Sequence, residues 1–518
     1  MDHFLLILPF VLILASPLVI GWVRIPGASR LLSGQLLGVG LPALAAGSLI
    51  LAYSRLGDTR LLSGALRLEG LGVFGAVSVM LLAAASSVGV GQHACGRRSQ
   101  LARGSLLTGQ VIAVLTGDLF ITALGLTVAC VSGPALLDPL PPHASSKRHA
   151  LRRLASSLLP SLGLFLGAGL LYAAVDQHNI DSLAQGIFQQ MLSVRRGLSS
   201  LPHGLTAGFL LWVLGLILAS GGVPVLQWDP DRRQGVRSTS VWLCGSERVV
   251  GAILLYRWVA CFAFSMQESH GVLLAVVAML GVGYAALSAI SSPRISASLA
   301  SLRRLQTSMI LVLVAGAALL LPRSRGHVAH FHSGSEAVLL QVFSDSVLWA
   351  GLLILLPSAR LWARYTTHPP QVRGATRVTR FSVVCLLMSL AGLPGTLGGL
   401  SKVRTFQWMQ QTQTYTNDLA VALTVLFAVG TVVQFLVILR VLATFLEWRG
   451  GFHPSRIAFD KDSPGVSTDP AQPNRLVAYG LSALALAAVF LPLWTELLGL
   501  PGRELVVDLI RLCLPRAP

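Results

Sequence analysis

The chain has 518 residues, of which 53% are apolar and 12% are charged, and its mean hydropathy is +0.70. Soluble proteins carry about 25% charged residues, so this composition excludes an ordinary soluble enzyme. The net charge of +18 does not indicate nucleic-acid binding, because the basic residues lie in short clusters between apolar runs. These runs are about twenty residues long, the length of a helix that crosses a bilayer. The sequence therefore predicts an all-α, polytopic membrane protein.

In chain order, the apolar runs predict about fourteen transmembrane helices, near residues 4–22, 35–53, 71–91, 104–117, 118–137, 151–175, 204–226, 238–263, 271–290, 306–321, 336–357, 378–400, 418–446 and 476–499. The run 104–137 is too long for one span at about 1.5 Å per residue. We expect it to break at Gly117-Asp118 and Asp118 to cap the helix that follows, because a carboxylate favours the positive end of a helix. Glu336 and Asp345 are expected to open the eleventh span in the same way.

The basic residues predict the orientation of the spans. With the N-terminus outside, the inner loops carry roughly twice as many Lys and Arg residues as the outer loops. Both termini are therefore expected on the outer side, and the basic loops 138–150 and 358–377 on the inner side. The chain begins without a basic leader, so we expect no cleaved targeting segment. The cysteines show no CxxC pair, and His327, His330 and His332 have no carboxylate nearby, so no metal site is predicted.

Two predicted spans contain Gly and Pro interruptions. Gly221, Gly222 and Pro224 fall in the seventh span, and Gly392, Pro394 and Gly395 fall in the twelfth. Proline removes a backbone donor, and a break survives in a membrane only where protein or water satisfies the freed carbonyls. We expect both helices to be broken and to face the interior, as in internally repeated ion transporters. The alternative is ordinary kinks in a chain with 51 glycines.

A few charged residues fall inside predicted spans. Lys402 follows the second interruption, in a chain where only Lys147, Lys402 and Lys461 are lysines. Lysine can lose its proton when buried, whereas arginine is held in its charged form, which favours a titrating role for Lys402 over a snorkelling one. Glu247 and Arg248 lie in the eighth span, with Arg257 further along. Either a buried chain for protons or an ion pair between helices would explain these charges.

Several segments then resemble the antiporter-like subunits of respiratory complex I. Residues 388–402, MSLAGLPGTLGGLSK, resemble the family pattern SLAGxPxxxGFxxK, and residues 223–231, VPVLQWDPD, resemble VPFHxWxPD. Residues 118–132 are similar to DLxxxFxGLExxS, and residues 301–308 are similar to KRxxAYSS. The match runs from about residue 104 to 446 and is most like the N-type subunits.

The resemblance implies two inverted five-helix repeats, each with a broken helix. It divides the chain into an N-terminal three-helix segment (1–103), a first repeat (104–263), a second repeat (271–446), and a loop with a last helix (447–518). In this family a glutamate of the fifth span tunes a membrane lysine, and a chain of lysines relays protons. The family glutamate aligns with Thr127, and its other lysines and a histidine align with Arg152, Ala219, Val249 and Leu226. Only Lys402 is kept.

The resemblance implies a non-redox membrane-arm subunit of a proton-translocating NADH:quinone oxidoreductase, with Lys402, Arg152, Glu247 and Arg248 as candidates for the proton path. No cofactor is expected in this chain. Its expected partners are other membrane-arm subunits and the lipid bilayer, with no nucleic acid. Its expected location is a bacterial plasma membrane or a mitochondrial inner membrane. The replaced positions leave open a proton-inactive structural subunit of the same arm. A cation/proton antiporter or bicarbonate-uptake subunit of the same superfamily is a further alternative.

Overall fold

The computed structural model describes residues 8–16, 19, 30–61, 64–88, 97–137, 144–195, 203–220, 238–262, 267–292, 295–320, 328–364, 373–413 and 418–447, and residues 483, 486, 489 and 490. Its named helices are α2 (Arg30–Leu56), α3 (Gly70–Val88), α4 (Arg97–Leu115), α5 (Leu119–Leu137), α6 (Ala144–Val175), α7 (Ile180–Arg195), α8 (His203–Ala219), α9 (Ser238–Phe262), α10 (Gln267–Ser291), α11 (Ile295–Leu320), α12 (Val328–Arg364), α13 (Arg373–Ala391), α14 (Leu397–Gln413) and α15 (Asp418–Glu447).

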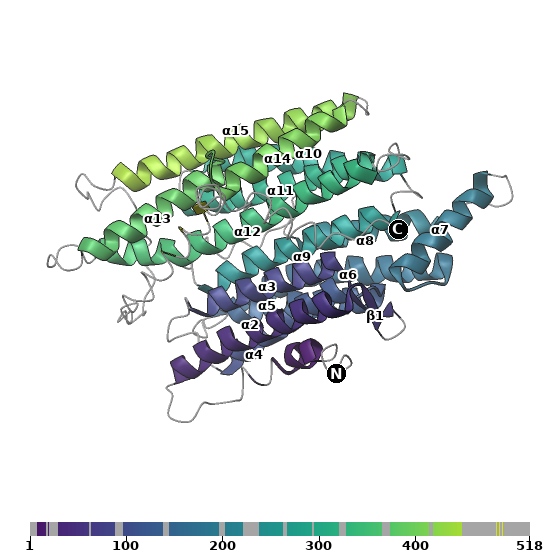
Figure 1. The fold of residues 1–518 in the computed structure, drawn as a ribbon, viewed down its shortest axis with the longest axis horizontal. Coiled ribbons are helices and arrows are strands. Elements are labelled where there is room, and N and C mark those ends of the chain that lie inside the picture. Colours follow the sequence, from purple (N-terminus) through teal and green to yellow (C-terminus); the bar gives the residue numbers. More distant parts are fainter. Residues whose placement is uncertain are drawn as a thin grey trace.

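The helices lie alongside one another as one elongated bundle (Figure 1). Helices α2 to α6 lie on one side and α10 to α15 on the other, and α9 contacts both α3 and α12 between them. Within the described residues, five helices contain stretches long and apolar enough to span a membrane: Leu37–Leu56, Leu158–Val175, Gly271–Ser291, Ser301–Leu319 and Leu419–Ala443. The sequence prediction of a helical membrane protein is confirmed.

Helix α11 is the central element of the second half. Its apolar stretch Ser301–Leu319 is 78% buried, whereas the other four membrane-spanning stretches are between 33% and 39% buried. Helix α11 packs against α9, α10, α12, α14 and α15. The outer helices α10 and α15 instead expose large apolar side chains such as Leu287 and Val432. Because water-exposed apolar stripes of this length are rare in soluble proteins, these faces fit lipid or a membrane partner.

The break expected within 104–137 is confirmed. Helix α4 ends at Leu115 and α5 begins at Leu119. The carboxylate of Asp118 accepts hydrogen bonds from the backbone N–H groups of Phe120 at 2.8 Å and Ile121 at 3.0 Å, so Asp118 caps α5 as expected. Glycines at the crossing of α4 and α5 let the two backbones approach closely: a Cβ on Gly125 would lie 2.7 Å from the carbonyl oxygen of Gly109.

Two features differ from the prediction of transmembrane helices joined by loops. The antiparallel strands β1 (Thr59–Leu61) and β2 (Leu66–Leu68) form a hairpin between α2 and α3, with Thr59 opposite Leu68. Helix α7 lies between the predicted spans 151–175 and 204–226, where the sequence predicts no helix. Ile180, Leu183 and Ile187 lie on one buried face of α7, with polar residues between them, so no continuous apolar run marks it in the sequence.

The eleventh predicted span begins earlier than expected. Helix α12 starts at Val328, so Glu336 and Asp345 lie inside it and do not open it. The prediction that both are helix-start carboxylates is therefore wrong, because the polar stretch that precedes them is helical rather than a loop.

Candidate functional site

The second Gly-Pro interruption divides one predicted span into α13 and α14, with residues 392–396 as the turn between them. In a continuous helix the N–H of residue 394 would bond the carbonyl of Leu390, but Pro394 has no N–H. The freed carbonyl oxygen of Leu390 instead accepts two hydrogen bonds, each of 2.7 Å, from Nζ of Lys402 and Nε2 of Gln434. The proline thus creates the acceptor that holds the lysine.

Gly392 makes room for Lys402. Its φ of +96° lies in a region that favours glycine, and a Cβ at this position would lie 2.7 Å from Cδ of Lys402. On the other side of the turn, the hydroxyl of Thr396 accepts from the N–H of Gly399 at 3.3 Å and caps α14. Lys402 is 5% exposed. The ammonium is therefore fixed in position and shielded from solvent.

The lysine site lies near the middle of the membrane-spanning region. Gln434, which shares the Leu390 carbonyl with Lys402, lies close to the centre of the 25-residue span Leu419–Ala443. At about 1.5 Å per residue, the site is more than 10 Å from either end of that span. A charge at this depth is costly and usually functional.

The tip of the turn does not face the interior. Ser389 and Leu390 before it and Thr396 to Lys402 after it are buried, but Leu393 is 42% exposed and Pro394 and Gly395 are also exposed. The expectation that the broken helix faces the interior therefore holds for its two helical ends and is wrong for the tip. The sequence carries no signal for this, because a Gly-Pro turn looks the same whichever way it faces.

Arg248 is a second buried cation at the centre of the bundle. Its guanidinium donates to the carbonyl oxygen of Arg303 at 2.7 Å and to Oε1 of Gln306 at a long 3.5 Å, and it lies 5.7 Å from the ring centroid of Trp349. A small cavity beside Arg248, with space for about one water molecule, is lined by α8, α9 and α11. Arginine stays protonated, so Arg248 supplies a fixed charge.

A carboxylate and amides connect the two cations. Nε2 of Gln306 donates to Oδ1 of Asp345 at 3.2 Å, and Nε2 of Gln341 donates to Oδ2 at 2.9 Å. Asp345 interacts electrostatically with both Arg248 and Lys402. The result is a buried polar line from Arg248 through Gln306 and Asp345 to Lys402. The sequence analysis assigned Asp345 to a helix start and not to this line, and it missed the glutamines because isolated amides carry no local pattern.

The structure describes the side chains of only some of the remaining predicted residues. Glu247 is partly buried on α9 and interacts electrostatically with Arg248 and Arg303. Arg152 lies in α6, on a stretch whose side chains are outside the described set. The first interruption, with Gly221, Gly222 and Pro224, lies outside the described residues. Thr127, at the position of the family glutamate, donates to the carbonyl of Ala123 in its own helix at 2.7 Å.

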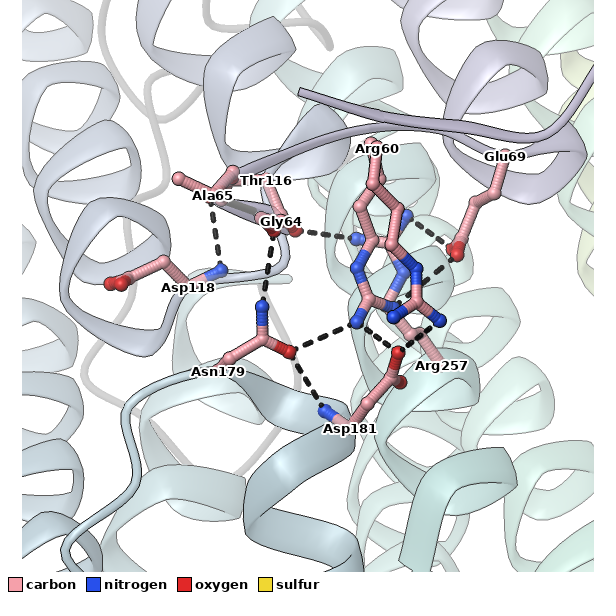
Figure 2. A network of polar contacts seen from close by, with 10 residues as sticks. Arg60, Gly64, Ala65, Glu69, Thr116, Asp118, Asn179, Asp181 and Arg257 are labelled. Carbon is pink, nitrogen blue, oxygen red and sulfur yellow. Dashed lines mark hydrogen bonds and ion pairs between the residues drawn. The ribbon is translucent and has the colours of Figure 1, made fainter. Parts of the chain in front are cut away.

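A separate charged network, the hairpin clamp, joins the hairpin to the helix ends around it (Figure 2). We define it as Arg60, Arg67, Glu69, Asp181 and Arg257. Asp181 pairs with Arg60 at 3.0 Å and with Arg67, and Glu69 pairs with Arg67 at 3.7 Å and with Arg257 at 2.6 Å. Signs alternate from exposed Arg60 to buried Arg257. Arg257 of α9 therefore forms an ion pair with Glu69, which lies directly before α3.

The charge of Arg67 is stabilised by its acidic partners in the clamp. Burial lowers the pKa of the Arg67 guanidinium, but its hydrogen bond to Asp181 and the charges of Asp181 and Glu69 outweigh burial and hold the pKa above its ordinary value. Arg257 also donates to the carbonyl of Thr116 at 2.9 Å. The clamp thus ties α3 and α9 to the α4–α5 junction and to the start of α7.

We expect Arg257→Met to lower the free energy of unfolding by about 1–3 kcal/mol, because the buried carbonyl of Thr116 loses its donor and the carboxylate of Glu69 loses the closer of its two cations. Thermal unfolding in detergent would measure this. Arg60→Met is the matched control, since the Arg60 side chain is 70% exposed and surface pairs contribute below about 1 kcal/mol. Equal losses from the two variants would contradict the clamp as a buried support.

Apolar helices around buried charges define a polytopic membrane protein with a polar interior. Residues 117–428, more than half of the chain, match the transmembrane family described as NADH:quinone oxidoreductase/Mrp antiporter. The chain belongs to this family.

Individual proteins agree with this assignment. The chain is 26% identical over 266 residues to the NADH-quinone oxidoreductase subunit N of Cutibacterium acnes, which covers 50% of this chain and 47% of that protein. The chain thus spans about half the length of this curated relative. Among solved structures, a chain of the Mrp complex from Dietzia sp. superposes with a TM-score of 0.70 and 15% identity, over 99% of this chain and 52% of that one. A chain of respiratory complex I from Thermus thermophilus gives a TM-score of 0.63 and 15% identity, over 99% and 100%.

Proposed function

We propose that this chain is a non-redox membrane-arm subunit of an NADH:quinone oxidoreductase and that it couples quinone reduction elsewhere in the complex to proton translocation. The observation that carries this proposal is the buried ammonium of Lys402, held on a carbonyl that Pro394 leaves free. A titratable cation fixed near mid-membrane can accept and release a proton when charge changes nearby. The relationship to subunit N supports the assignment to a quinone-linked complex.

The proposed architecture extends the fold beyond its described part. It has fourteen spans, with residues 1–103 as an N-terminal segment, 104–263 and 271–446 as two inverted repeats, and 447–518 as a loop with the last helix. Both termini lie on the outer side of the inner membrane. The basic content of the loops 138–150 and 358–377 supports an inner location for them.

Within the proposed mechanism the two cations have different tasks. Arg248 cannot release a proton and serves as a fixed charge at one end of the polar line. Arg152, the other arginine candidate, cannot release a proton either. Lys402 changes its protonation state, and Gln306 and Gln341 hold the carboxylate between the cations. Glu247, next to Arg248, is a second carboxylate that can exchange a proton in the first half.

The exposed tip of the broken helix supports a neighbouring membrane subunit as partner. Irregular backbone does not face lipid inside the hydrocarbon region, because lipid cannot satisfy its polar groups. Leu393, Pro394 and Gly395 are exposed in this chain, although the adjoining Leu390 carbonyl lies near mid-membrane. Another subunit of the membrane arm would cover them.

Two other functions fit specific observations. A proton-inactive structural subunit is favoured by Thr127, whose hydroxyl is bonded within its own helix and cannot take over from a glutamate. A cation/proton antiporter subunit is favoured by the similarity to the Mrp complex. The retained Lys402 opposes the structural alternative, and the match to subunit N opposes the antiporter one.

Purification in mild detergent tests the proposed assembly. We expect the full chain to copurify with peripheral flavin and iron–sulfur subunits and with quinone-reducing activity. Copurification with other membrane subunits alone, in a complex that exchanges cations for protons, would support the antiporter alternative and contradict our proposal.

A further inference from the structure

The packing of α12 against α14 places Asp345 opposite Lys402. Gly334 of α12 lies against the indole ring of Trp408, and Gly398 of α14 lies against Leu348. Residue numbers rise along one helix as they fall along the other, so the helices are antiparallel. Asp345 is one turn before Leu348, and Lys402 is one turn after Gly398, which places both on the same side of that contact.

Among the residues that the structure describes, no cation forms a direct ion pair with Asp345. It is 2% exposed, and its two oxygens accept hydrogen bonds from the neutral amides of Gln306 and Gln341. The cations that interact with it are Arg248 of α9 and Lys402 of α14. The guanidinium of Arg248 is already held by the carbonyl of Arg303 and packs on Trp349. Because a buried charge is costly unless it is compensated, Lys402 on the neighbouring helix is the cation available to this carboxylate.

We propose that Asp345 is the acidic partner of Lys402 and exchanges a proton with it. This rests on the proposed function of Lys402 in proton transfer. The proton leaves Nζ of Lys402 and binds an oxygen of Asp345, so one N–H bond breaks, one O–H bond forms, and the net charge of the pair stays zero. The ammonium donates to the carbonyl of Leu390, so the proton crosses by a swing of the lysine chain or through one water molecule.

The proposed acidic residue of this chain lies in a different repeat from the glutamate of the family pattern. The resemblance places the tuning glutamate on the fifth span, in the first repeat, where Thr127 now stands. Asp345 belongs to the second repeat, as does Lys402. Acid and lysine therefore lie on helices in direct contact within one repeat, and Arg248 supplies the fixed charge from the other.

A double-mutant cycle tests the pair independently of transport. We expect Asp345→Asn and Lys402→Met each to lower the thermal unfolding midpoint of the full chain in detergent by several degrees, because each leaves an uncompensated buried charge. The double variant should lose clearly less than the sum of the two, since it removes both charges. Asp345→Asn combined with Arg257→Met is the matched control and should be additive. Additive losses for Asp345 and Lys402 would overturn the proposal. If either single variant fails to fold, a folded double variant supports the pair, and a double variant that also fails contradicts it.

Proton movement by the assembled complex tests the function of the pair. Asp345→Asn should lower the number of protons moved per NADH oxidised, and Asp345→Glu should restore most of it, which a merely structural carboxylate would not do. If the losses in unfolding midpoint are non-additive but Asp345→Asn and Lys402→Met both leave the proton ratio unchanged, the interaction between the two residues is supported and the proposed function is contradicted. If Lys402→Met lowers the proton ratio but the losses in unfolding midpoint are additive, the proposed function is supported and Asp345 is overturned as the partner of Lys402.

Discussion

Gly392→Ala is expected to uncouple proton movement from NADH oxidation in an assembled complex. Gly392 has a φ of +96°, and forcing alanine into that region costs about 1–2 kcal/mol. Its methyl group would also lie 2.7 Å from Cδ and 3.3 Å from Nζ of Lys402. We expect the side chain of Lys402 to shift and its hydrogen bond to the carbonyl of Leu390 to weaken. We expect the proton ratio to fall severalfold and the thermal unfolding midpoint to fall by a few degrees.

Gly395→Ala separates these two effects. Gly395 also has a positive φ, of 81°, but it lies on the exposed tip of the same turn. Alanine there should strain the backbone and lower the unfolding midpoint while the proton ratio stays near wild type. A proton ratio that falls equally in both glycine variants would show that backbone strain, and not the displaced lysine, causes the loss.

The local features of the lysine site could be predicted because proline and glycine act through the backbone. Pro394 cannot donate to Leu390 in any fold, so the interruption follows from the sequence alone. The position of Lys402, one turn into the next helix, likewise needs only helical geometry. The cap at Asp118 is a third example, since it depends on residues within one turn.

The partners of Lys402 could not be predicted in this way. Gln434 and Asp345 come from helices that are adjacent in space but distant in sequence, and no spacing rule joins them. The polar residues between Val328 and Glu336 also concealed the true start of α12. Asp345 was therefore placed at a helix end, where a carboxylate has an ordinary structural role.

The ion pairs of the hairpin clamp could not be predicted from the sequence either. Glu69 and Arg257 pair across most of the first half of the chain, and Arg67 meets Asp181 only because the hairpin folds over the start of α7. The strands are three residues long, too short for an alternating pattern to be visible. Short pairings of this kind are fixed by the packing around them.

Lys402→Met is expected to have the largest effect on function. Methionine keeps the length of the side chain and its apolar stem but removes the proton-carrying group. Lys402→Arg should be nearly as harmful, because a guanidinium retains the charge and the hydrogen bond to Leu390 but cannot release its proton. If Lys402 only supports packing, the arginine variant should resemble wild type and the methionine variant should fail to assemble.

Protons moved per NADH oxidised, measured in vesicles that contain the reconstituted complex, test the central claim most directly. We expect assembled Lys402→Met and Lys402→Arg complexes to oxidise NADH while moving fewer protons than wild type. An assembled Lys402→Met complex with an unchanged proton ratio would contradict a proton role for this chain and leave it as a structural subunit.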